Sequence, residues 1–473
     1  MLYYDNLVLQ ANLDSFFSCE RATHLSRAEI NRTRMLEAPV ARTLAELTIP
    51  MIFGMLSMVL YNLADTYFVG QLGKDQLAAM SFTFPVVLTI NSLSLGIGMG
   101  AAAAISMAIG SRDPERVRRL ATDSLVLGLL IISCGVATGL LTLEPLFSLL
   151  GAHGQILEYT GEYMRIWYLG MIFVVFPMIG NNILRATGDT KTAGMIMSTG
   201  AIVNFFLDPV LIFGIGPIPA YGIKGAAIAT LIGRSSTFVL SMYVLIWRER
   251  ILTMSIPRPC EIWQSWKEIL HVGIPDAGAR MIIPVGQGAI TRIVAGYGAA
   301  AVAGYGVATR VEFFSLAVLS ALATVIGPFV GQNLGAKQYA RVRRGFTVSC
   351  NFSIAFGLSL FVGYLFLADK IAGLFNEDPE VVATAALYIR LVSLAFAAQG
   401  FYFVVNAGLN VLKRPLLAAG LSLLELFVLA IPLALIGSHL FELTGVFAAI
   451  GVSYLLTGIF GWVLITRVLA EDR

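Results

Sequence analysis

Long apolar stretches, separated by short segments rich in charged residues, glycine or proline, occupy almost the whole chain. A stretch of about 20 apolar residues is long enough to cross the hydrocarbon core of a bilayer as an α-helix. The 57% hydrophobic and 13% charged residues also exclude an ordinary soluble fold, which could not bury this much apolar surface. We therefore expect an all-α polytopic membrane protein with twelve transmembrane helices, near residues 46–70, 83–108, 122–143, 159–183, 192–214, 222–247, 271–296, 302–330, 346–368, 384–408, 415–437 and 442–466.

The last six predicted helices repeat the first six at a spacing of 225 residues. At this spacing Gly110 meets Gly335, and the Arg-Val-Arg-Arg sequence at 116–119 meets the same four residues at 341–344. The register continues without a gap for roughly 135 residues. Duplicated bundles of this kind are typical of secondary transporters, in which the substrate path lies between the repeats. We predict two six-helix lobes that arose by duplication.

Lysine and arginine are distributed unequally between the two ends of the predicted helices. The termini and the loops on their side contain 23 of these residues, whereas the opposite loops contain only Lys74, Lys224 and Lys370. Cytoplasmic loops are enriched in lysine and arginine, so both termini are predicted to lie in the cytoplasm and the protein in the inner membrane. Because six helices return the chain to its starting side, the lobes should be related by a pseudo-two-fold axis along the membrane normal. The predicted parts are a cytoplasmic N-terminal segment 1–45, a first lobe 46–247, a cytoplasmic interlobe loop 248–270, a second lobe 271–466 and a cytoplasmic C-terminus 467–473.

Several other functions are not expected from this sequence. The net charge of +3 follows from the basic loops and indicates no nucleic-acid partner. Residues 1–34 contain no long apolar run and do not resemble a signal peptide, and Met35 is an alternative start. The four histidines form no HExxH motif, so we expect neither an enzyme nor a resident metal or cofactor.

Acidic side chains inside the predicted helices are few, and two of them lie at matching depth. Asp65 and Asp208 are each about 8 to 9 Å from the outer end of a helix, at 1.5 Å per residue. Asn204 is one helical turn from Asp208 on the same face, and Thr230 on the next helix lies at a similar level. In the repeat, Asp65 falls opposite Ile290, so the second lobe does not share this feature. The four side chains predict one oxygen-rich pocket in the first lobe.

Two carboxylates in a pocket of low dielectric cannot both remain ionised cheaply, because burial and mutual repulsion favour binding of a proton. The same oxygen donors suit a small hard cation such as sodium. Ionisable groups inside a membrane are costly and usually functional. We therefore expect a coupling site for protons or sodium, and the sequence does not distinguish the two ions.

Three segments resemble one transporter family. The segment 50–73, PMIFGMLSMVLYNLADTYFVGQLG, is similar to the first helix of the multidrug and toxic compound extrusion (MATE) family. The segments 204–214 and 225–230 resemble its fifth and sixth helices, and the resemblance extends over residues 40 to 467. It implies twelve helices in two lobes and export of amphiphilic, often cationic compounds in exchange for protons or sodium.

The resemblance also implies site residues. In members with an ion site in the first lobe, the matching positions are Asp65, Asn204, Asp208 and Thr230, together with a tyrosine of the fourth helix that corresponds to Tyr163 or Tyr168. Another branch has acidic residues in the seventh and tenth helices. Here the seventh predicted helix contains only Asp276, near its end, and the tenth contains none. The chain therefore resembles the DinF-type branch, which is coupled through the first lobe.

The second lobe contains arginines inside its predicted helices. Asp276 and Arg280 are spaced i,i+4 and can form an ion pair on one helix. Arg310 cannot meet Glu312 on its own helix, so Glu425 is its expected partner. An Arg310–Glu425 pair would act as a gate between the lobes or as a second proton site.

The expected function is secondary active export of small amphiphilic or cationic compounds by a monomer surrounded by lipid. A lipid-linked saccharide or lipid flippase is the alternative, because such proteins share a duplicated bundle. A flippase should have arginines at cleft depth in both halves to bind pyrophosphate, whereas the first-half candidates here are acidic.

Labelling of single cysteines tests the predicted orientation. Cysteines in 71–76, 297–301 and 438–441 should react with an impermeant thiol reagent added outside the cell, and cysteines in 112–119 and 337–344 should not. The reverse pattern would invert the topology and move the paired aspartates to the other surface.

Overall fold

The computed structural model describes residues 30–72, 74–214, 217, 219–253, 255 and 258–471. Residues 1–29 of the predicted N-terminal segment lie outside this range. In the described part of the chain the regular structure is helical throughout. The helices of the first half are α2 (Val40–Gly70), α3 (Lys74–Gly110), α4 (Pro114–Leu141), α5 (Leu143–Leu149), α6 (Gly154–Leu169), α7 (Met171–Ala186), α8 (Thr190–Phe213) and α9 (Ile223–Tyr243), which the π-helical turn η1 (Val244–Arg248) extends.

The second half repeats this order in α10 (Pro259–Ala295), α11 (Ala299–Gly335), α12 (Tyr339–Gly373), α13 (Pro379–Ser393), α14 (Phe396–Val411), α15 (Pro415–Leu423), the π-helical η2 (Leu424–Ala430) and α16 (Ile431–Glu471). Non-helical dihedral angles at Phe441 and Glu442 divide α16 into two rods. The rods fold back on each other, and their backbones are in contact at two glycines. A methyl group at Gly437 would lie 2.3 Å from the carbonyl oxygen of Gly445. Eight described helices are long and apolar enough to cross a membrane, or ten if α6 with α7 and α13 with α14 each count as one bent span. The division of α16 and the 37-residue α10 bring the rods to the predicted twelve.

The duplication is visible in the helix boundaries. Helices α3 and α11 begin and end at positions 225 residues apart, and so do the starts of α4 and α12. The fourth span of each half is bent at matching positions, by 52° between α6 and α7 and by 59° between α13 and α14. Asp113 caps the start of α4 by accepting a hydrogen bond from the backbone N–H of Arg116 at 3.0 Å, and Pro114 occupies the first turn.

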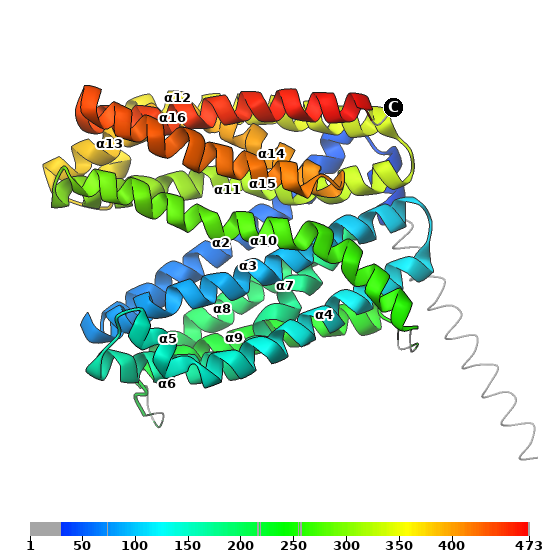
Figure 1. The fold of residues 1–473 in the computed structure, drawn as a ribbon, viewed down its shortest axis with the longest axis horizontal. Helices are drawn as coiled ribbons and strands as arrows, with labels where there is room; N and C mark the ends of the chain where they lie inside the picture. The colour runs from blue at the N-terminus through cyan, green and yellow to red at the C-terminus, as the bar shows by residue number, and fades with distance from the viewer. Residues whose placement is uncertain are drawn as a thin grey trace, which may run out of the picture.

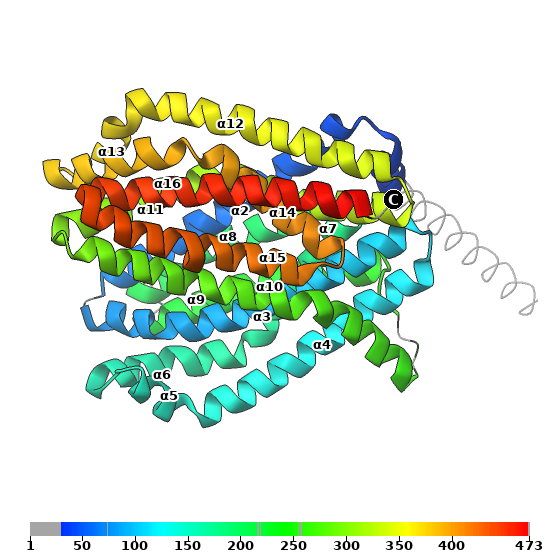
Figure 2. The ribbon, with the colours of Figure 1, turned by 45° about the horizontal axis from the view of Figure 1, so that its top comes forward.

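The two lobes lie one above the other in Figure 1, with the C-terminus at the right-hand end. The N-terminal part of each lobe also contacts the other lobe. The terminal nitrogen Nη2 of Arg341, in α12, donates hydrogen bonds to the carbonyl oxygens of Met35 and Ala38 before α2. The start of α10 lies in turn beside α4, where Arg116 pairs with Glu268 at 2.5 Å. Figure 2 shows α10 passing close to α3 as it crosses the molecule.

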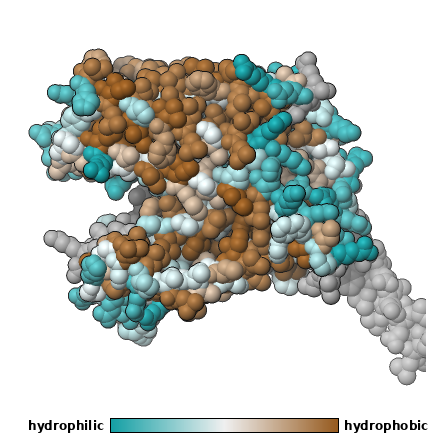
Figure 3. Space-filling model, viewed as in Figure 1, coloured by the Kyte–Doolittle hydropathy of each residue, from teal (hydrophilic) through white to brown (hydrophobic). Residues whose placement is uncertain are grey.

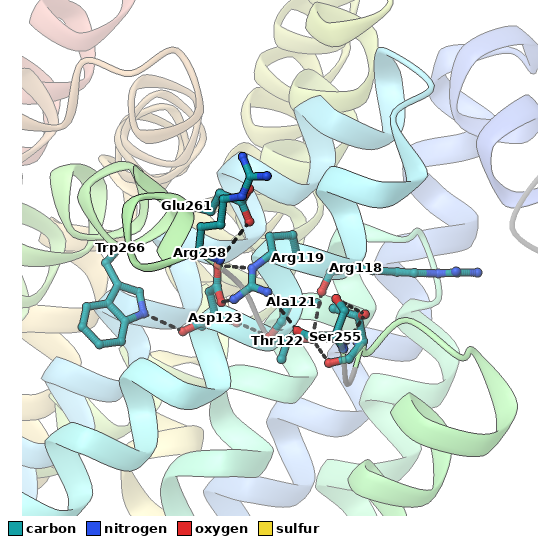
Figure 4. A network of polar contacts seen from close by, with 11 residues as sticks. Arg118, Arg119, Ala121, Thr122, Asp123, Ser255, Arg258, Glu261 and Trp266 are labelled. Carbon is teal, nitrogen blue, oxygen red and sulfur yellow. Dashed lines mark hydrogen bonds and ion pairs between the residues drawn. The ribbon is translucent and has the colours of Figure 1, made fainter. Parts of the chain in front are cut away.

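The connection between the lobes is fastened to α4 (Figure 4). The indole N–H of Trp266 donates to the carbonyl oxygen of Asp123 at 3.0 Å, and Thr253 donates its backbone N–H to the hydroxyl of Thr122 at 2.9 Å. The predicted interlobe loop 248–270 is shorter than expected, because α10 already begins at Pro259, a residue suited to a first helical turn.

At the right-hand end of Figure 1 the two lobes are in contact, because glycines let the backbones of α3 and α11 meet. A methyl group at Gly110 would lie 2.2 Å from the carbonyl oxygen of Gln332, and one at Gly335 would lie 2.2 Å from that of Met107. These two contacts are equivalent under the repeat, because Met107 corresponds to Gln332 as Gly110 does to Gly335. The pseudo-two-fold axis therefore passes through this crossing of α3 and α11.

Helix α3 also packs closely against the backbone of α10, with the small side chain of Ala277 beside Gly96. A methyl group at Gly100 would lie 2.1 Å from the carbonyl oxygen of Ile269, and one at Gly96 would lie 2.3 Å from that of Gly273. Such backbone approach is the usual basis of tight helix packing in membranes. At the opposite end the lobes separate, and Figure 3 shows a hollow between them at the left.

Substitution of Gly100 by valine should disrupt the closed end, because no Cβ fits against the Ile269 carbonyl. We expect a loss of about 1–3 kcal/mol, as for other overpacked sites, seen as a lower melting temperature in detergent. Gly420→Val is the control, because nothing lies within 4 Å of a methyl group at Gly420. Equal melting temperatures for the two variants would contradict the tight contact.

Candidate functional site

One large cavity lies between the lobes, with a volume of about 690 Å³. It is lined by residues of both repeats, and its lining from α3 consists of Leu95 and Met99, which neighbour the glycine contacts with α10. Its walls are mainly apolar and aromatic, and its polar lining includes Tyr61, Asn204, Thr230, Arg234, Arg185, Arg280, Asp276, Glu312 and Glu425.

The predicted first-lobe residues come together beside this cavity. Glycines allow α2, α8 and α9 to approach closely: a methyl group at Gly194 would lie 2.5 Å from the carbonyl oxygen of Pro50, and one at Gly233 would lie 3.1 Å from Cβ of Asn204. The amide of Asn204 donates to Asp208 Oδ1 at 3.2 Å and contacts the hydroxyl of Thr230 at 3.5 Å.

Asp65 completes the cluster from α2. Its side chain is buried, and its charge lies near those of Asp208 and Arg234. The guanidinium of Arg234 stacks 5.5 Å from the ring centre of Tyr61, whose hydroxyl is 3.5 Å from that of Thr230. Tyr61 and Arg234 are thus neighbours of the cluster that the sequence did not single out for this role.

The two tyrosines of the fourth span have different surroundings. Tyr163 is buried where it interacts electrostatically with Asp65, Tyr61 and Asp208. Tyr168 lies past the next turn, and its ring occupies the place where a methyl group at Gly139 would be, 2.5 Å away. Only Tyr163 is therefore beside the aspartates.

Three buried oxygen atoms of this cluster have no hydrogen-bond donor among the described residues. They are Oδ1 of Asp65, Oδ1 of Asn204 and Oδ2 of Asp208. Unpaired oxygens at this depth are costly unless a proton or a cation binds there. The donor set of carboxylate, amide and hydroxyl oxygens fits a proton or sodium, and the described residues contain no cluster of three or more His, Cys, Asp or Glu suited to other metals.

The predicted Arg310–Glu425 pair is not formed, and this part of the sequence interpretation is wrong. Arg310 lies on the surface of its helix, whereas Glu425 is buried and accepts a hydrogen bond from the amide of Gln399 at 3.1 Å. Glu425 belongs to the π-helical η2, which changes the direction of side chains relative to a regular helix.

Glu312 and Glu425 instead form an acidic group in the second lobe. The carboxylate of Glu312 accepts hydrogen bonds from the hydroxyls of Tyr388 at 2.6 Å and Tyr454 at 2.9 Å. Tyr388 is the repeat counterpart of Tyr163, so each lobe sets one such tyrosine beside a buried carboxylate. Glu425 interacts electrostatically with Glu312, and its Oε2 has no donor among the described residues.

The predicted Asp276–Arg280 pair is confirmed, with Arg280 Nε 2.7 Å from Asp276 Oδ2. The same part of the cavity contains Arg185, which the sequence interpretation counted among the basic loops. The predicted fourth span ends at residue 183, whereas α7 continues to Ala186 and turns the Arg185 side chain into the cavity.

The chain is similar to known membrane transporters along most of its length. The MatE family model matches the chain twice, at residues 50–210 and 275–436. A protein of Shewanella oneidensis named FAD transporter is 37% identical over 438 residues, which cover 93% of this chain and 97% of the relative. A Thermotoga maritima protein named probable multidrug resistance protein NorM is 26% identical over 382 residues, 78% of this chain and 79% of the relative.

Solved structures agree in fold. The Vibrio cholerae MATE transporter VcmN in its bent form superimposes with a TM-score of 0.85 at 28% identity, over 92% of this chain and 98% of VcmN. An outward-facing multidrug resistance MATE family transporter of the MOP superfamily gives a TM-score of 0.87 at 26% identity, over 93% of this chain and 98% of that one.

Proposed function

The chain belongs to the MatE family of membrane transporters, and we propose that it exports small amphiphilic compounds in exchange for protons or sodium. The proposed ion exchange rests on one observation. Three buried oxygens, on Asp65, Asn204 and Asp208, have no hydrogen-bond donor among the described residues. A proton or sodium ion bound there would neutralise one of two adjacent carboxylates.

The cavity supports alternating access as the mechanism. It is open between the lobes at one end, whereas the glycine contacts of α3 with α10 and α11 close the other end. We propose that the closed end, which carries the termini, faces the cytoplasm and that the membrane is the inner membrane. Binding of the coupling ion at Asp65 and Asp208 would favour one arrangement of the lobes over the other.

Two classes of cargo have support. Glu312 and Glu425 face the cavity without a basic partner among the described residues, and with Tyr305, Phe313 and Tyr402 nearby they suit a flat organic cation. The second candidate is FAD or a related flavin nucleotide, because the 37% identical relative is named FAD transporter and covers nearly the whole chain. Two arginines, Arg185 of the first half and Arg280 of the second, line the same cavity and favour this candidate, so the expectation that the first half offers acidic cleft residues alone is wrong.

Neutralising substitutions test the coupling site. Asp65→Asn and Asp208→Asn should each reduce gradient-driven export to background, because each removes an ionisable group while preserving shape. Thr230→Ala should cost less, about 1 kcal/mol or fivefold, since it removes one neutral ligand. The control is Asp369→Asn, which breaks an exposed ion pair with Arg390 and should leave export unchanged.

Export by both aspartate variants at the wild-type rate, with normal amounts of protein in the membrane, would refute the proposed site.

Tyr163→Phe should slow export, and Tyr168→Phe should not, because only Tyr163 is near the aspartates.

Everted membrane vesicles can identify both the ion and the cargo. Uptake of ethidium and of FAD should be measured with a proton gradient alone and with a sodium gradient alone. We expect one gradient to drive uptake of at least one of the two compounds, and Asp65→Asn to abolish it. Uptake of neither compound under either gradient would contradict the proposed exchange for these two cargo classes.

A further inference from the structure

Arg185 is a buried cation that has no acidic partner in the described part of the chain. Its side chain lies at the inner end of the cavity, 9% exposed, and its guanidinium contacts the amide oxygen of Asn182 in the preceding turn. No carboxylate lies within 4.0 Å of it among the described residues. A charge inside a membrane protein is costly unless it is paired or faces a water-filled or ligand-filled space.

A second guanidinium faces it from the other lobe. Arg280 of α10 lines the same end of the cavity, and the two charges are close enough to repel each other. Arg280 binds Asp276 through Nε at 2.7 Å, and the other carboxylate oxygen of Asp276 accepts from Asn410 at 3.1 Å. The terminal nitrogens of Arg280 have no partner in the described chain.

The local charge at this end of the cavity is therefore positive. Asp276 neutralises one guanidinium, and one positive charge remains over the pair. Among the described residues, Asp276 lies within ion-pair distance of Arg280, whereas Glu425 forms no ion pair with either arginine. The free N–H groups of two guanidiniums can each donate to oxygens of one phosphate group. This arrangement suits a phosphate better than a single lysine or an amide would.

We propose that Arg185 and Arg280 together bind the phosphate groups of an anionic, nucleotide-type cargo at the closed end of the cavity. The aromatic and methionine side chains nearer the opening then contact the flat ring system of the same molecule. One arginine comes from each lobe, so the bound anion links the two lobes and relieves the repulsion between the guanidiniums. This inference rests on the proposed export function and specifies its substrate class.

Binding measurements on purified protein in detergent separate this inference from transport. Flavin fluorescence anisotropy should be recorded with FAD and with riboflavin, which has the same ring system but no phosphate. Wild-type protein should bind FAD at least about tenfold more tightly than riboflavin. Arg185→Gln should weaken FAD binding about 10- to 100-fold and leave riboflavin binding within about twofold, because only the charged contact is lost.

Further variants distinguish the anion site from a structural role. Arg280→Gln should show the same selective loss, and Arg185→Lys should retain part of the FAD binding because it keeps the charge. Arg390→Gln, which alters an arginine outside the cavity, should change neither ligand. Retained riboflavin binding in each variant shows that the cavity is intact.

Three results would overturn the inference: equal affinity of the wild-type protein for FAD and riboflavin, equal loss of both ligands in Arg185→Gln and Arg280→Gln, or unchanged FAD binding in both. Because no gradient is imposed, failure of ion-coupled export would leave the predicted preference for FAD in place. Loss of that preference would likewise leave export of ethidium unaffected.

Discussion

The structure depends on backbone contact between helices that have glycine where a side chain would keep them apart. At the crossing of α3 and α11, Gly110 and Gly335 contact the backbone of the other helix in two contacts related by the repeat. Lipid provides little hydrophobic drive for helices to associate, so close packing of this kind carries much of the energy. The contact holds the lobes together at one end, and the cavity exists because the lobes diverge from it.

The same packing accounts for the position of the polar residues. Gly194 and Gly233 bring α2, α8 and α9 close enough to enclose Asp65, Asn204 and Asp208 away from lipid. A buried cluster with unpaired oxygens is costly, and such a cost is usual where an ion has to bind and leave. The lobes differ chemically although their helices match: the first places aspartates beside Tyr163, and the second places Glu312 beside Tyr388.

Depth along a helix and the shared face of residues four apart, as in Asp276 with Arg280, could be predicted from the sequence, but which neighbouring helix a side chain faces could not. The twelve spans, the repeat and the level of Asp65 and Asp208 follow from hydrophobic length and residue count, which are local properties. The choice between Tyr163 and Tyr168 depends on rotation about the helix next to the bend between α6 and α7. The Arg310–Glu425 pair failed for the same reason, because the π-helical turn at Glu425 alters the direction of its side chain. Arg185 was missed because it lies at the end of a span, where an arginine is normally a loop residue.

Alternating access requires the two ends of the cavity to open in turn, so the contact of α3 with α10 and α11 has to separate when the opposite end closes. Spin-label distance measurements in lipid nanodiscs test it with two pairs related by the repeat: Glu115 with Ala340 at the closed end, and Leu149 with Leu374 at the open end, all four exposed. Acidification, sodium or cargo should lengthen the first distance while shortening the second. Distances that change together, or that stay fixed under all three conditions, would contradict alternating access.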